Sequence, residues 1–103
     1  MTYAVYTTES FEKEIEDLSK FEKEKLQRIF LQLKENPYVG DGIRYKFFRE
    51  KRLVKKRIYY LIYDDLSAVL IVAFGGKKPQ KETINEIVKS FPEFREYLKK
   101  ILD

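Results

Sequence analysis

The sequence contains no cysteine and no histidine. The first absence excludes a disulfide framework and a thiolate metal site. The second removes the commonest general base, the commonest metal ligand and the usual Ser–His and Cys–His nucleophile pairs. An enzyme of this composition must transfer protons through Lys, Arg, Tyr, Asp or Glu. Since no metal-ligand spacing occurs either, we expect no metal and no cofactor.

Long hydrophobic runs are missing as well. The longest is a run of about seven apolar residues at 68–74, far below the roughly 18–20 that a membrane span requires. No window resembles a signal peptide, so we expect a soluble cytoplasmic protein without a membrane partner. The 103 residues fit one domain, 1–103, and 44% of them are hydrophobic, which is enough for a core.

Residues 53–74 carry the clearest secondary-structure signal. From Arg57 to Tyr63 the apolar and aromatic side chains alternate between two sides with a period of two. Asp64 to Ser67 supplies turn chemistry, and the apolar run follows. Enrichment in β-branched and aromatic residues predicts two strands joined as a hairpin. Because the second strand is apolar on both sides, we expect it at the centre of a sheet.

Two helices are expected near the N-terminus, after a short strand at 3–7. The first has apolar residues at helical spacing (Phe11, Ile15 and Leu18) and should be about ten residues long. Ser19 is a plausible cap for the second helix, which Asn36-Pro37 ends. Such a helical pair must bury its apolar stripes on a sheet.

The rest of the chain completes an α+β pattern. Residues 43–48 predict a strand, 49–52 a charged turn, and the segment after Pro79 predicts helix, interrupted at Pro92. The order is therefore β-α-α-β-β-β-α. We expect a small single domain with an antiparallel sheet, two N-terminal helices packed on one face, and a cationic opposite face.

Positive charge is concentrated in one segment. The formal net charge is +4, and residues 1–36 carry a net of −2. Residues 44–57 hold eight basic side chains and one acid, Glu50. Such a concentration is typical of a protein with a polyanionic partner. A merely solvated hairpin face is the alternative.

Four segments carry a resemblance to a known family. They are Thr-Thr-Glu-Ser-Phe-Glu-Lys-Glu-Ile at 7–15, Lys-Glu-Asn-Pro at 34–37, Lys-Lys-Arg-Ile-Tyr-Tyr-Leu-Ile-Tyr at 55–63, and Lys-Lys-Pro-Gln-Lys at 77–81. In this order they resemble the RelE/ParE/HigB superfamily of toxins from type II toxin–antitoxin systems. The resemblance implies a RelE-like fold and a metal-independent endoribonuclease that cleaves mRNA on the ribosome. It also implies a cognate antitoxin, a small acidic protein, as partner.

The resemblance further implies the site residues. Arg57 matches the family's third-strand arginine, Arg44 and Lys46 match a basic pair on its second strand, and Lys77 matches the basic residue after the fourth. We expect Arg57, Lys46 and Lys77 to be catalytic and to surround the scissile phosphate. Expected to bind substrate are Arg44, Arg49, Arg52, Lys55, Lys78, Lys81 and Tyr59.

Two departures from the family pattern affect this assignment. The tyrosine near the start of the last helix has no match, since Thr83 stands there, and this leaves the general base open. The loop before Lys77 is one glycine longer than usual, so that Lys77 and Lys78 can exchange roles.

The chemistry leaves several alternatives open. Arginine suits the charge that develops on a phosphorane, and a lysine can act as base only if crowding among cations lowers its pKa. Arg57 could instead pair with Asp64 or Asp65, and Tyr59 could belong to the sheet core. At the level of function, the rivals are a ParE-like toxin that binds DNA gyrase without catalysis and a degenerate RNA-binding module.

Overall fold

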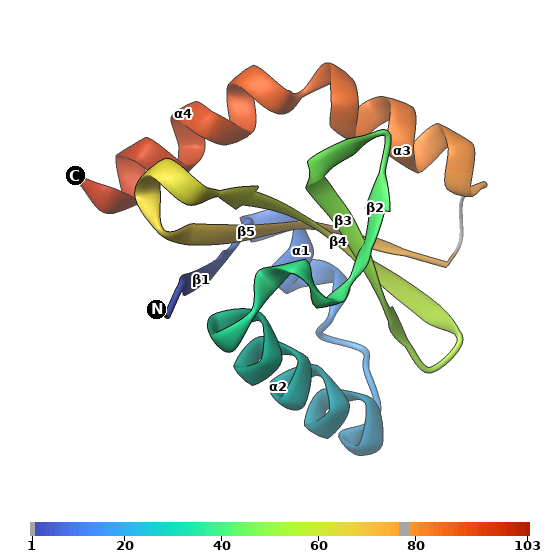
Figure 1. The fold of residues 1–103 in the computed structure, drawn as a ribbon. Coiled ribbons are helices and arrows are strands. Elements are labelled where there is room, and N and C mark those ends of the chain that lie inside the picture. The colour runs from blue at the N-terminus through green and yellow to red at the C-terminus, as the bar shows by residue number, and fades with distance from the viewer. Residues whose placement is uncertain (1, 77–78) are drawn as a thin grey trace.

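A computed structural model of the chain describes residues 2–76 and 79–103 (Figure 1). The fold is α+β, as expected, with a five-stranded sheet in the order β1-β5-β4-β3-β2. All strand pairs are antiparallel except β1 and β5, which are parallel. The elements are β1 Ala4–Thr7, α1 Glu9–Glu14, α2 Lys20–Glu35, η1 Pro37–Val39, β2 Asp41–Ile43, β3 Tyr45–Leu53, β4 Lys56–Tyr63, η2 Asp64–Leu66, β5 Ala68–Gly75, α3 Gln80–Lys89 and α4 Phe91–Leu102.

The first two helices begin at side-chain caps. The Thr8 hydroxyl accepts from the Phe11 amide at 3.2 Å, and Ser19 forms a reciprocal capping box with Glu22. α1 has six residues instead of the expected ten, because a tighter turn replaces the α-helical pattern after Glu14, with the Leu18 amide bonded to the Ile15 carbonyl. α2 ends before Pro37, as expected.

The third strand differs from expectation. Residues 49–52 are not a turn: they lie inside β3, where Glu50 pairs with Tyr59 and Arg52 with Arg57 across β4. Leu53 pairs with Lys56, so the turn is the two-residue loop Val54-Lys55. Val54 has a φ of 57°, a conformation that normally favours glycine. A charged run therefore forms a strand, and a β-branched residue forms the turn.

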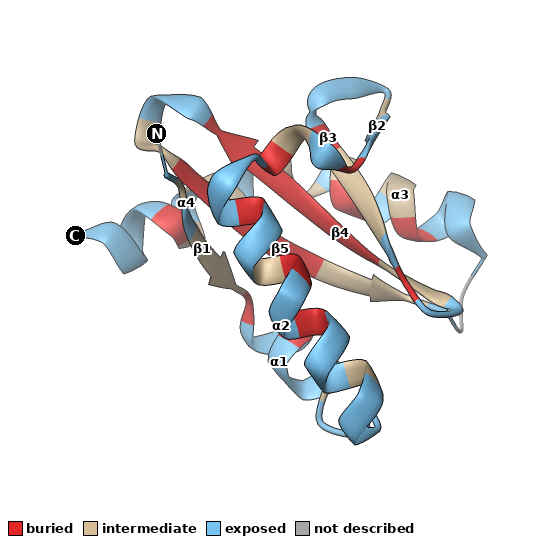
Figure 2. Ribbon diagram, turned by 60° about the horizontal axis from the view of Figure 1, so that its bottom comes forward, coloured by how far each residue is buried: buried red, intermediate tan, exposed pale blue. Residues whose placement is uncertain are grey.

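Both faces of the sheet are covered (Figure 2). On one face, α1 and α2 pack on the even-numbered residues of β4 (Ile58, Tyr60 and Ile62). On the other, α3 and α4 pack on the odd-numbered ones (Tyr59, Leu61 and Tyr63). β5 lies between β1 and β4 with buried residues on both sides, which confirms its central place. The second face is therefore apolar under two helices, and the expectation of a cationic face was wrong.

Within the described residues, no helix is long and apolar enough to cross a membrane. Asp64 and Asp65 are bound by groups other than Arg57. The Tyr3 and Tyr38 hydroxyls donate to the Asp64 carboxylate at 2.8 and 2.6 Å, and Arg95 donates to Asp65. The open alternative that one of these aspartates pairs with Arg57 was wrong.

Candidate functional site

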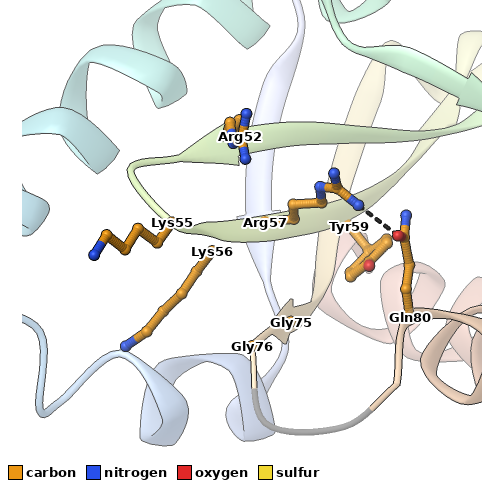
Figure 3. Close-up of a pocket in the computed structure, with 8 residues that line it drawn as sticks. All are labelled: Arg52, Lys55, Lys56, Arg57, Tyr59, Gly75, Gly76 and Gln80. Atoms are coloured by element: carbon orange, nitrogen blue, oxygen red, sulfur yellow. Dashed lines mark hydrogen bonds between the residues drawn. The ribbon is translucent and has the colours of Figure 1, made fainter.

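A basic hollow lies where the β3–β4 hairpin meets the start of α3 (Figure 3). Its volume is about 150 Å³. Cations of the hairpin form much of its wall, and the end of β5 and the first residue of α3 close it. The lining residues are Arg52, Lys55, Lys56, Arg57, Tyr59, Gly75, Gly76 and Gln80.

Gln80 and Glu50 hold the Arg57 side chain at this hollow. Its Nη1 donates to the Oε1 of Gln80 at 2.5 Å, and its Nε lies 4.0 Å from the Oε1 of Glu50. The Nε2 of Gln80 in turn donates to the second oxygen of Glu50 at 3.0 Å. The strand register explains why Arg57 and Glu50 are neighbours, because Arg57 lies across from Arg52 and Glu50 across from Tyr59. Gln80 reaches both side chains from the start of α3. The three side chains therefore form one cluster that orients the guanidinium.

The guanidinium of Arg57 remains accessible. Its side chain is 37% exposed, whereas that of Glu50 is only 15% exposed. Figure 3 shows Arg57 extending toward Gln80, while Lys55 and Lys56 extend away from it. Arg52 is the cation that lies directly opposite Arg57 on the neighbouring strand. Lys55 and Lys56 add positive charge around the hollow.

Tyr59 forms part of the hollow's wall and belongs to the core on the α3 side. It is 1% exposed, so its ring is not an open stacking surface. Burial raises the pKa of the Tyr59 hydroxyl, and the Glu50 carboxylate raises it further, while the charge and hydrogen bond of Arg57 oppose the shift. The phenol is therefore neutral at physiological pH and can donate a proton or a hydrogen bond but not act as a base.

The structure places several expected site residues together. Arg52, Lys55 and Tyr59 line the same hollow as Arg57, and Lys81 is exposed on α3 next to Gln80. Lys77 and Lys78 lie outside the described residues.

Lys46 does not lie beside Arg57. Its ammonium group is 5.3 Å from the ring centre of Tyr38, which packs against the core on the α1–α2 face, whereas Arg57 lies on the opposite face. Lys46 also precedes Arg52 by six positions on β3, which is roughly 20 Å along a strand. The expected convergence of Lys46 and Arg57 on one phosphate was wrong.

Arg49 and Arg44 make contacts away from the hollow. Arg49 donates to the carbonyls of Gly40 at 2.6 Å and Lys46 at 2.9 Å, which fastens the chain before β2 to β3. The Nη2 of Arg44 donates to the Oδ1 of Asn85 at 2.8 Å and so links β3's start to α3. Arg49 therefore has a structural role, and Arg44 lies on the α3 side.

Two polar residues that line the hollow, Lys56 and Gln80, were absent from the expected site, and so was Glu50, which contacts Arg57 and Gln80. Glu50 had a usable signal, since it is the one acid among the eight cations of residues 44–57. Gln80 stands in the Lys-Lys-Pro-Gln-Lys segment of the resemblance, but only the packing of α3 brings it to Arg57. Lys56 belongs to the basic segment 44–57 but was assigned no role in the site from the sequence.

A second cavity of about 530 Å³ adjoins the hollow between α1, α3 and the end of β5. The two share Lys56, Gly75 and Gly76. Glu14 of α1, Asp17 in the turn after it and Glu86 of α3 line the second cavity. Its charge is thus mixed, in contrast to the basic hollow.

Neither a protein-family model nor a curated protein matches the sequence. The structure, however, is similar to several solved toxins. A doubly substituted Escherichia coli RelE in the free state gives a TM-score of 0.75 at 21% identity, over 88% of this chain and 99% of RelE. The toxin of the intact E. coli RelBE toxin–antitoxin complex gives 0.66 at 18% identity, over 75% and 99%. The toxin–antitoxin complex RelBE2 of Mycobacterium tuberculosis gives 0.65 at 20% identity, over 75% and 100%. The chain therefore has the RelE-like toxin fold.

Proposed function

We propose that this protein is the toxin of a type II toxin–antitoxin system and cleaves mRNA on the ribosome without a metal. The observation that carries the proposal is the position of Arg57: an accessible arginine, oriented by two polar side chains, in a basic hollow of a RelE-like fold. A RelE-like toxin that acts on mRNA works in the cytoplasm, which agrees with the expected localisation.

Arg57 and Arg52 are the proposed phosphate ligands. A guanidinium binds phosphate through two parallel N–H bonds and keeps its charge at all physiological pH values. Their positions across one strand pair let both address the same phosphodiester. Lys55 and Lys56 add long-range attraction for the RNA backbone. Lys77 stays a proposed site residue, outside the described part of the chain.

The reaction we propose is attack of the 2′ oxygen on the adjacent phosphorus. The 2′ hydroxyl loses its proton, the new P–O bond closes a 2′,3′-cyclic phosphate, and the P–O5′ bond breaks to release a 5′ hydroxyl. Glu50 is the described carboxylate nearest Arg57 and is the candidate proton acceptor. Arg57 stabilises the extra charge on the phosphorane. The leaving oxygen takes its proton from water or from the neutral Tyr59 hydroxyl.

The partner we propose is a small acidic antitoxin. Solved relatives of this fold are present in complexes with an antitoxin. A net charge of +4 and the basic segment 44–57 would complement an acidic polypeptide.

Expression of the wild type, Arg57→Ala and Arg28→Ala in a bacterial host tests the proposal. Arg28 is an exposed arginine on the outer side of α2 and serves as the matched control. We expect growth arrest and new codon-linked 5′ ends in translated mRNA for the wild type and Arg28→Ala, and neither for Arg57→Ala. DNA breaks without new RNA ends would instead indicate a gyrase-binding toxin. RNA binding without cleavage would indicate an RNA-binding module.

A further inference from the structure

We propose that three aromatic side chains form a second RNA subsite, on which bases of the single strand stack as the strand leaves the basic hollow. The residues are Tyr45 and Phe47 of β3 and Phe91 at the start of α4. The inference rests on the proposed function and names a further part of the RNA-binding surface.

The three rings touch one another at the surface. Tyr45 and Phe47 stack with ring centres 5.3 Å apart, and Phe91 lies edge-on to both, at 5.7 and 5.3 Å. Phe91 also packs edge-on against the buried Phe48, which anchors the cluster in the core. Tyr45 and Phe47 are nevertheless 45% and 38% exposed. A rigid base with open aromatic faces is the arrangement on which nucleobases stack.

Helix α3 connects this aromatic cluster to the hollow. At its start Gln80 contacts Glu50, in its middle Asn85 contacts Arg44, and just past its end Phe91 contacts Tyr45. The helix therefore runs along β3 in the opposite direction. The ten residues of α3 span about 15 Å, and the five steps along the strand from Glu50 back to Tyr45 span about 17 Å. Figure 1 shows α3 and α4 along this side of the sheet.

The side of α3 that meets Arg44 also carries cations. Lys81, Asn85 and Lys89 follow at intervals of four and so share one side of the helix, and both lysines are exposed. Glu86 is directed elsewhere, because it lines the second cavity. A strand that enters the hollow at Arg57 would thus pass Lys81, Arg44 and Lys89 before it reaches the rings.

The charge around the rings favours RNA over a protein partner. Arg44 lies beside Tyr45 on the α3 side, Lys46 lies over Tyr38 on the other face, and residues 42–49 contain no acid. An acidic antitoxin could bind cations but would gain little from exposed ring faces beyond ordinary apolar contact. A single-stranded polyanion with a flat base at every unit uses both features at once.

The test is a double-mutant cycle in which the aromatic rings are removed from the protein and the bases are removed from the RNA, separately and together. Binding is measured by fluorescence anisotropy with a labelled single-stranded RNA of about twelve nucleotides, within the size range of such sites, and with a probe of the same length that is abasic beyond its first few nucleotides. The proteins are the wild type, Tyr45→Leu/Phe47→Leu, Arg57→Ala and Phe21→Leu. Phe21 is 59% exposed on α2 and is the matched aromatic control. Leucine keeps apolar volume, and thermal unfolding verifies that each variant folds.

We expect the double leucine variant to bind the complete RNA about 5- to 100-fold more weakly than the wild type, and the abasic probe equally well. Phe21→Leu should match the wild type, and Arg57→Ala should weaken binding of both probes alike. If the double leucine variant lost affinity equally for both probes, or lost none, the subsite would be overturned. Weaker binding by Arg57→Ala in the same data would still support the proposed function. Absence of any RNA binding by the wild type would overturn the subsite, while growth arrest and new mRNA ends in the expression experiment would still decide the proposed function. A double variant that keeps full RNA affinity but escapes its antitoxin would assign the rings to the protein partner and overturn the inference.

Discussion

The Oε1 of Glu50 lies 4.0 Å from the Nε of Arg57, and one glutamine, Gln80, bonds to both side chains. Gln80 accepts from one N–H of the guanidinium, so a phosphate can bind the remaining donors of Arg57. The same contacts hold the Glu50 carboxylate beside the proposed phosphate ligand. In the proposed mechanism, both the charge balance at Arg57 and the proton transfer are assigned to Glu50, the one acid paired with Arg57 among the described residues.

Replacing Glu50 by glutamine separates these two roles. Glu50→Gln keeps a carbonyl acceptor for Gln80 but removes the negative charge beside Arg57. We expect RNA affinity to rise, up to about fivefold, since this pair joins a partly exposed arginine to a largely buried carboxylate at 4.0 Å and contributes on the order of 1 kcal/mol. We expect the cleavage rate to fall by about 10²–10⁴, the usual contribution of a general base. Single-turnover cleavage and anisotropy measure the two effects, with Glu24→Gln on the exposed side of α2 as control. Unchanged cleavage would remove Glu50 from the proton transfer.

Gly75 leaves room for the ring of Tyr59. A β-carbon at Gly75 would lie 2.9 Å from the Cε2 of Tyr59, closer than real contacts allow. Gly75→Ala should push the ring toward Arg57 and lower stability by about 1–3 kcal/mol, the usual cost of overpacking. Urea unfolding measures the change. Gly42→Ala is the matched control, because its β-carbon would meet no atom closer than 3.8 Å. Equal stabilities of the two variants would contradict this account of Gly75.

Val54 should be replaceable by glycine with a gain in stability. Its φ of 57° places a β-branched side chain in the left-handed region, at a cost on the order of 1 kcal/mol, while glycine adopts this conformation freely. Val54→Gly should raise the free energy of unfolding by up to about 1 kcal/mol, measured by urea titration. Val39→Gly at a similarly exposed valine without a positive φ should lower it. A loss of stability in Val54→Gly would show that the side chain makes contacts worth more than the strain.

Buried tyrosines predict a loss of stability at high pH. Burial raises the pKa of Tyr60 to about 12, above the value near 10 of an unfolded tyrosine. The unfolded chain therefore releases this proton first, so stability is complete below pH 10 and falls as the pH rises toward 12. Tyr60→Phe should show a shallower fall in urea unfolding over that range. At neutral pH the same variant should be less stable by about 1–3 kcal/mol, because the hydroxyl donates to the Pro37 carbonyl at 2.7 Å and accepts from the Gly40 amide. An equally steep alkaline fall would assign it to other groups.

The local pattern was sufficient for most elements. The Asn36-Pro37 end of α2, the period of two in β4 and the doubly apolar β5 each follow from interactions between near neighbours in the chain. The β3–β4 turn was misplaced because its residues, Val54 and Lys55, lack the glycine or asparagine that usually signals a hairpin turn. The strand partner β4 fixes that turn through its register, and register is a non-local property.

The sequence by itself determined the chemistry that this protein can use: arginine, lysine, tyrosine and carboxylates, with positive charge gathered in residues 44–57. It also determined the strands and helices whose side chains repeat with a clear period. Only the tertiary structure decided which cations meet. Arg52 reaches Arg57 because the strands pair antiparallel, Lys46 lies on the opposite face some 20 Å along the strand, and Gln80 arrives with the packing of α3. Proximity between distant segments follows from register and packing, and neither can be read from the order of residues alone.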